Sequence, residues 1–132
     1  MSAFTGPLAV QYGEGGGYRL AVLLEPLQWH CDFKGSEAVV IVPPGFESDG
    51  ASVPRPLWWF LPPWGDRSTR AAILHDFVCE ELIAGRPLPG CDTRERCDRQ
   101  FHLALLALGV AEWRGWLAWA GVRAYSITSG NG

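Results

Sequence analysis

The chain has 132 residues, a formal net charge of −3 and a hydrophobic share of 48%. This length suits a single domain over 1–132, and the apolar share is sufficient for a core that needs no metals or disulfides. The mildly acidic charge argues against a general nucleic-acid binder, which normally carries a basic face. Arg94, Arg96 and Arg99 do cluster, and we expect them to form the solvated face of a helix.

The first residues, MSAFTGPLAV, lack a charged start followed by a long apolar run, so the sequence predicts no signal peptide. No stretch has the roughly 20 apolar residues of a membrane span. The four cysteines form no CxxC pair, and without an export signal they are expected to be reduced thiols. Their spacing matches no usual zinc-binding pattern.

The first third of the chain has the composition of β-strands. Four stretches, PLAVQY, YRLAVLL, LQWHCDF and AVVIV, are rich in β-branched and aromatic residues. The glycines between Gly13 and Gly17 suit a flexible hairpin connection after the first stretch. We therefore expect a small antiparallel sheet over 7–42.

The stretch PPGFESDGASVPRPLWW opens a segment, 43–67, that has neither a helical nor a strand period. Its prolines fix φ and prevent a regular helix, so the sequence predicts an ordered, irregular loop rich in proline and tryptophan. Long irregular loops in compact domains are often functional. Trp58, Trp59 and Trp64 are therefore candidates for contact with a partner.

The remaining segment, 68–125, has helical periodicity, which makes the predicted fold class α+β. Gly85 and Gly109 are expected to end the first two helices. Asp92 with Glu95 three residues later forms a predicted capping box for the second helix. The three predicted helices cover 69–84, 92–108 and 111–125.

Ionisable side chains on two of these helices suit proton transfer or metal binding. His75 and Asp76 point about 100° apart on one helix, yet both can line a pocket at the helix edge. Asp98 and His102 lie four residues apart on one helix face, a spacing that can chelate a divalent metal. The ordinary alternatives are a His75 hydrogen bond that anchors the loop and an intrahelical Asp98–His102 bond.

The loop contributes polar candidates of its own in SDGASVPR. Ser52 becomes a nucleophile only if a base such as His75 reaches it; otherwise it is a turn hydroxyl. Asp49 before a glycine suits a turn in which the side chain bonds its own backbone. Arg55 can hold an anion or pair with an acidic residue of the first helix.

The order of these motifs resembles one protein family. The stretches VPPGFESDGASVPR, AAILHDFVCEE and CDRQFHLALLALGV are similar to the DUF1353 family, small proteins known mostly from bacteriophage and prophage genomes. The resemblance spans about 18–125 and implies no established activity. It also implies one polar cluster shared by the loop and the helices, and His102 lies outside the pattern. The matching polar positions are Asp49, Ser52, Arg55, His75, Asp76 and Asp98.

Two hypotheses follow from the resemblance and the residues. In the first, the protein is a non-catalytic virion, assembly or host-interaction component that binds a phage or host protein. The polar cluster then holds the loop on the helices, and exposed tryptophans make the contact. The protein would act in the cytoplasm of the host cell or in the virion.

In the alternative hypothesis, the protein is a small hydrolase-like enzyme with a His-Asp dyad. His75 would be the general base or, with Asp98, the ligand of a divalent metal. Asp76 or Asp98 would orient His75, and Ser52 or Arg55 would face the substrate. An open pocket at His75 favours the enzyme, whereas a buried cluster beside exposed tryptophans favours the binding protein.

Overall fold

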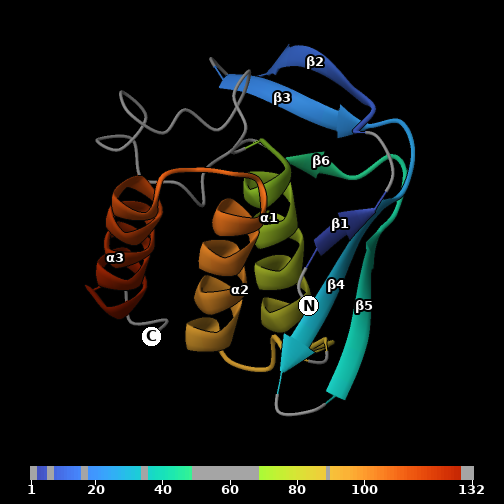
Figure 1. Cartoon of the computed structure of the whole chain (residues 1–132). Helices are drawn as coiled ribbons and strands as arrows, with labels where there is room; N and C mark the ends of the chain where they lie inside the picture. Colours follow the sequence, from blue (N-terminus) through green and yellow to red (C-terminus); the bar gives the residue numbers. More distant parts are fainter. Residues whose placement is uncertain are drawn as a thin grey trace.

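The computed structural model describes residues 3–5, 8–15, 18–33, 36–48, 69–88 and 90–128. In these residues two small antiparallel sheets precede three helices, which confirms the α+β class (Figure 1). A single sheet was expected, but the strands divide into two sheets of three strands each.

The first sheet has the strand order β1-β4-β5, where β1 is Ala3–Thr5, β4 is Leu27–Phe33 and β5 is Ser36–Val42. Residues in β4 alternate between the two faces, so Leu27, Trp29 and Cys31 are buried. Trp29 is opposite Val40, which is also buried. One face of this sheet therefore packs on the core.

The second sheet contains β2 (Val10–Gly15), β3 (Tyr18–Leu23) and the short β6 (Glu47–Ser48). The pairs from Val10↔Leu23 to Gly15↔Tyr18 confirm the predicted hairpin. Strand β6 lies inside the segment that was predicted to be irregular. That prediction is wrong at Glu47 and Ser48, because they pair with Val22 and Ala21 of β3.

The helices are α1 (Thr69–Ile83), α2 (Arg94–Ala107) and α3 (Glu112–Thr128). Gly85 and Gly109 follow α1 and α2 with φ of 81° and 83°, a conformation that glycine adopts without strain. Helix α3 continues three residues beyond the predicted end at 125. Among the described residues, no helix is both long and apolar enough to cross a membrane.

The predicted capping box at the start of α2 is wrong. Thr93, not Asp92, is the N-cap, and its Oγ1 accepts a hydrogen bond of 3.2 Å from the backbone N–H of Arg96. The Asp92 carboxylate instead accepts from Nη1 of Arg96 at 2.8 Å, on the protein surface.

The helices lie in a row, with α2 between α1 and α3, and the first sheet packs against both α1 and α2 (Figure 1). A buried hydrogen bond of 2.9 Å from Nε1 of Trp29 to Oε1 of Gln100 joins β4 to α2. The core extends from the sheets to α3. Its largest fully buried apolar side chains are Trp29, Phe101, Leu23, Leu27, Ile73, Leu74, Leu105, Val40, Val42 and Val78.

A glycine in the first turn of α3 gives a first testable prediction. A Cβ added to the buried Gly115 would meet Leu106 at 3.5 Å and His102 at 3.6 Å, which are ordinary contacts. Glycine inside a helix costs about 1 kcal/mol relative to alanine. We therefore expect Gly115→Ala to raise the free energy of unfolding by about 0.5–1 kcal/mol in urea titrations.

Gly85→Ala is the control for this prediction. Nothing lies within 4 Å of a Cβ added at Gly85, yet its φ of +81° strains any residue with a side chain. Gly85→Ala should therefore lower the free energy of unfolding by about 1 kcal/mol. A loss of stability in Gly115→Ala would mean that α2 and α3 pack too closely at that point to accept a methyl group.

Candidate functional site

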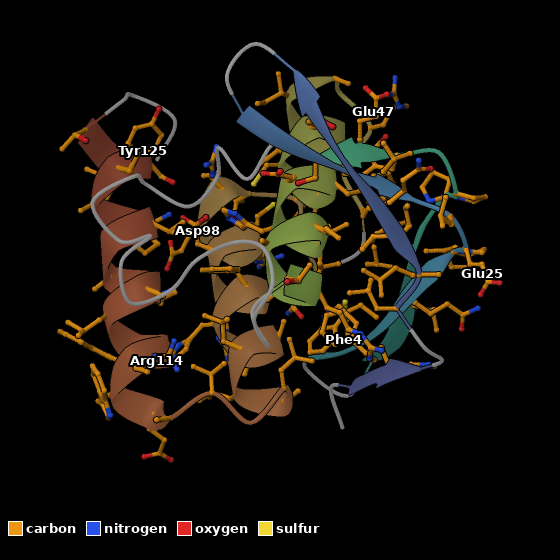
Figure 2. The ribbon with its side chains drawn as sticks, turned by 90° about the horizontal axis from the view of Figure 1, so that it is seen from above. Phe4, Glu25, Glu47, Asp98, Arg114 and Tyr125 are labelled. Atoms are coloured by element: carbon orange, nitrogen blue, oxygen red, sulfur yellow. The ribbon has the colours of Figure 1, made fainter. Side chains whose placement is uncertain are left out.

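The carboxylate of Asp98 is the centre of a polar cluster between the three helices. The Nε2–H of His75 on α1 donates to its Oδ1 at 2.7 Å. Nη1 of Arg123 and Oγ of Ser126, both on α3, donate to Oδ2 at 3.0 and 3.1 Å. Nε of Arg94, one turn before Asp98, lies 3.4 Å from Oδ1. One carboxylate therefore joins α1, α2 and α3, and Figure 2 shows it between α2 and α3.

The cluster is closed to solvent. The side chains of His75 and Asp98 are both 0% exposed, and those of Arg94 and Arg123 are 10% and 13% exposed. The ring of Phe101 lies against the imidazole, with ring centroids 4.9 Å apart. A buried carboxylate is stable only with charged or hydrogen-bonding partners, and these residues supply both.

Burial and pairing act in opposite directions on the pKa values of the dyad. Burial by itself lowers the pKa of His75, but Cys79 and the Asp98 carboxylate outweigh it and raise this pKa to about 9. Burial by itself raises the pKa of Asp98, but its bond with His75 and the charges of Arg123 and Arg94 hold that pKa below its ordinary value. At neutral pH the dyad is therefore an imidazolium bonded to a carboxylate.

The imidazole keeps one nitrogen without a partner. Nδ1 of His75 is buried and has no hydrogen-bond partner among the residues that the structure describes. Cys79 lies one turn after His75 on α1 and is also buried. Ligand atoms of His75, Cys79 and Asp98 all lie within 4.8 Å of one another, close enough to surround one metal ion.

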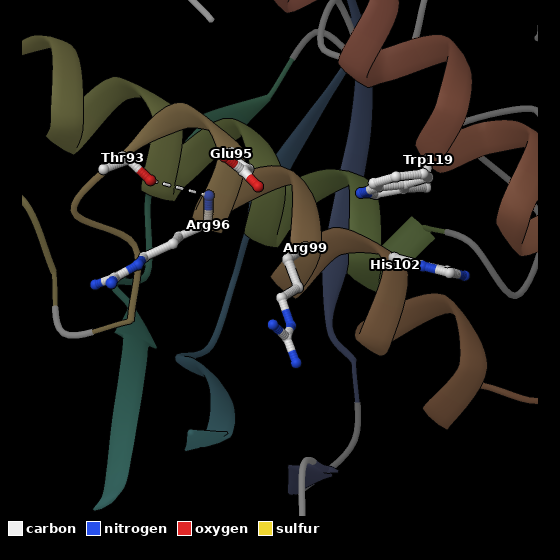
Figure 3. Close-up of a pocket in the computed structure, with 6 residues that line it drawn as sticks. All are labelled: Thr93, Glu95, Arg96, Arg99, His102 and Trp119. Atoms are coloured by element: carbon white, nitrogen blue, oxygen red, sulfur yellow. Dashed lines mark hydrogen bonds between the residues drawn. The ribbon is translucent and has the colours of Figure 1, made fainter. Parts of the chain in front are cut away.

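A surface pocket of about 660 Å³ lies between α2 and α3, apart from the buried cluster. His102 stacks on Trp119 of α3, with centroids 5.8 Å apart and an interplanar angle of 25°. Burial lowers the pKa of His102, so this imidazole is neutral at pH 7. Figure 3 shows the lining residues, which are Thr93, Glu95, Arg96, Arg99, His102 and Trp119.

A second, apolar pocket of about 530 Å³ adjoins the first at His102. Leu106 of α2 and Trp113 and Trp116 of α3 line it, together with Glu112. Trp113 is 62% exposed and Trp116 is 55% exposed. The two pockets together make one surface, which we call the α2–α3 surface, with the charged residues Glu95, Arg96 and Arg99 towards one end and Trp113 at the aromatic end.

A family model described as DUF1353, a protein of unknown function, matches residues 22–122. The chain belongs to the DUF1353 family. The match contains His75, Arg94 and Asp98, but it ends one residue before Arg123, so two partners of Asp98 lie beyond it. No curated protein and no solved structure matches this DUF1353 chain.

Of the polar set that the DUF1353 resemblance implies, His75, Asp76 and Asp98 lie among the described residues. His75 and Asp98 do meet, but Asp76 accepts a hydrogen bond from Ser48 at the end of β6. His102 stacks on Trp119 rather than joining the Asp98 cluster. The loop candidates lie outside the described residues. These are Asp49, Ser52, Arg55, Trp58, Trp59 and Trp64.

Several residues of this DUF1353 protein's cluster were missed at the level of sequence. Arg94 was expected on a solvated face, but it is nearly buried against Asp98, and its spacing of four residues was the available signal. Cys79 stands four residues after His75, which was a second local signal. No local sequence signal indicated Arg123 and Ser126, because they lie 25 and 28 residues from Asp98.

Proposed function

We propose that this protein is a non-catalytic binding component of the phage type, and that its α2–α3 surface contacts a phage or host protein. Trp113 and Trp116 carry the proposal, because two large aromatic side chains, each more than half exposed, stand beside a pocket. Tryptophan is enriched among the residues that dominate binding energy at protein interfaces. The phage setting, in the host cytoplasm or in the virion, follows from the genomes in which the family is known.

The chemistry of the α2–α3 surface indicates the type of partner. Arg99 has no ion-pair partner among the described residues, and it lies at the charged end of the surface. Trp113, Trp116 and Leu106 form the apolar end. Arg99 and Leu106 are seven residues apart on α2, or roughly 10 Å along the helix axis. A protein segment with an apolar side chain about three extended residues from a carboxylate would fit this surface.

The state of the His75–Asp98 dyad favours a binding role over a hydrolase. A general base must be unprotonated and within hydrogen-bond reach of its target. With a pKa of about 9, the His75 imidazole already holds the proton that a base would have to take up. Its Nε2 is bonded to Asp98, and the side chain is fully buried. The dyad, with Arg123 and Ser126 bonded to Asp98, is therefore better suited to holding three helices together than to catalysis.

Photo-crosslinking followed by titration tests the proposed contact. A photo-crosslinking amino acid replaces Trp116 in the full chain, which is produced in phage-infected host cells. It should capture a protein that the same amino acid at Ile83 does not capture, although Ile83 is 75% exposed. Calorimetry with that purified protein should then show at least about 10-fold weaker binding for Trp116→Ala than for wild type.

Ile83→Ala is the matched control and should bind like wild type, because its side chain is exposed but lies on α1, outside the α2–α3 surface. His75→Gln, if folded, should also bind like wild type. Equal capture from positions 116 and 83, or unchanged affinity in Trp116→Ala, would overturn the proposal.

A further inference from the structure

We propose that His75, Cys79 and Asp98 bind a divalent metal ion that accepts thiolate, such as Zn²⁺, and that this ion joins α1 to α2. The three side chains are buried, and their ligand atoms lie within 4.8 Å of one another. They offer one nitrogen, one sulfur and one oxygen, which are the three donor types of protein zinc sites. This inference is independent of the proposed binding function.

The chemistry of the donors selects the class of metal. A thiolate is a soft ligand that Mg²⁺ and Ca²⁺ avoid, since both prefer oxygen ligands. Zinc binds such mixed sets with four ligands, and three protein ligands leave one position open. The site therefore differs from the one expected from Asp98 and His102, because its soft donor comes from α1.

The geometry needs only a small adjustment to admit the ion. Nε2 of His75 and Oδ1 of Asp98 are 2.7 Å apart, joined by one hydrogen bond. Tetrahedral ligands at zinc distances of about 2.0–2.1 Å stand roughly 3.3 Å apart, so the pair must separate by roughly 0.6 Å. The buried Nδ1 of His75 has no partner among the described residues, so no hydrogen bond at that nitrogen opposes a small movement of the ring.

The arginines around Asp98 are compatible with a bound metal ion, because binding leaves the total charge of the ligand set unchanged. Without the ion, an imidazolium, a neutral thiol and a carboxylate carry no net charge. With it, Zn²⁺ replaces one proton on His75 and one on Cys79, and the set again carries no net charge. Arg94 and Arg123 therefore face an unchanged total charge, and they keep Asp98 oriented as partners outside the ligand set.

Cobalt provides a direct probe of the proposed site. The full chain, first treated with a chelator, is titrated with Co²⁺ alone. We expect one equivalent to bind and to give a near-ultraviolet thiolate-to-cobalt charge-transfer band, which Zn²⁺ then removes by displacement. Zn²⁺ should also raise the midpoint of thermal unfolding of the metal-free protein, because an ion that binds only the folded state stabilises it.

Cys79→Ser tests the sulfur ligand, and Cys31→Ser is its matched control, a buried cysteine on β4 outside the ligand set. Cys79→Ser should lose the charge-transfer band and bind Zn²⁺ at least about 10-fold more weakly, whereas Cys31→Ser should keep both properties. Cys79→Ser with the wild-type band and affinity would overturn the proposal. If Cys79→Ser fails to fold, the wild-type titration decides, because folded wild type without one equivalent of bound Co²⁺ or Zn²⁺ overturns it equally.

Discussion

Asp98→Asn should lower the free energy of unfolding by about 3–5 kcal/mol, the largest effect that we expect from a single substitution. Asparagine keeps the shape of aspartate but removes the negative charge. Arg94 and Arg123 would then remain almost fully buried with no compensating carboxylate, and His75 would lose the charged partner that helps to keep it protonated. Chemical denaturation at pH 6, in the presence of a chelator, measures the loss.

The same change at Asp92 is the control. Asp92 is 52% exposed, and its partner Arg96 is 47% exposed. Such surface pairs contribute about 0.2–1 kcal/mol, so Asp92→Asn should cost less than about 1 kcal/mol. If Asp98→Asn cost no more than Asp92→Asn, the cluster would not be the connection that holds the three helices together.

The stability of the metal-free protein should fall by up to about 3 kcal/mol as pH rises from about 6.5 to 9. The pKa of His75 rises from about 6.5 in the unfolded chain to about 9 in the folded protein. Its contribution is therefore fully present below pH 6.5 and is lost as pH rises through 9. The pKa of Asp98 is lowered, so its contribution is present above its unfolded value of about 3.9 and is lost in acid.

Two variants separate this effect from other titrations. His75→Gln keeps a hydrogen-bond donor that does not titrate, so it should lack the decline that begins near pH 6.5. It should keep only the fall near pH 9 that the thiols of Cys31, Cys79 and Cys97 cause, because their pKa values are raised in the folded protein. His102→Gln should retain the decline, because the pKa of His102 is lowered by burial and its titration falls below the window. Urea denaturation at successive pH values measures all three proteins. A wild-type profile as flat as that of His75→Gln would contradict the imidazolium–carboxylate pair.

Local sequence patterns predicted the elements well where short-range physics decides them. The composition of LQWHCDF predicted a strand, and β4 buries Leu27, Trp29 and Cys31 on one face. Gly85 and Gly109 do stand just beyond their helices, because each adopts a positive φ that other residues avoid. The N-cap was one residue off, since Asp92 and Thr93 are both good caps.

The candidate site was less predictable, because its contacts join distant parts of the chain. His75 and Asp98 were both candidates from the sequence, but their pairing across 23 residues depends on which faces of α1 and α2 meet. The sequence predicted Arg94 on a solvated helix face. In the structure its side chain is nearly buried, because the buried carboxylate of Asp98, one turn away, requires a cation. The α2–α3 surface likewise exists only because α3 packs beside α2.

The sequence by itself determined the α+β class, the strands β2 to β5, the three helices and the places where the first two helices end, because periodicity and glycine conformation act over a few residues. Only the tertiary structure decided that Asp98 bonds His75, Arg123 and Ser126 rather than His102. A carboxylate that is removed from water is stable only when it accepts hydrogen bonds from the donors that packing places around it. Those donors come from helices whose relative placement no local pattern encodes.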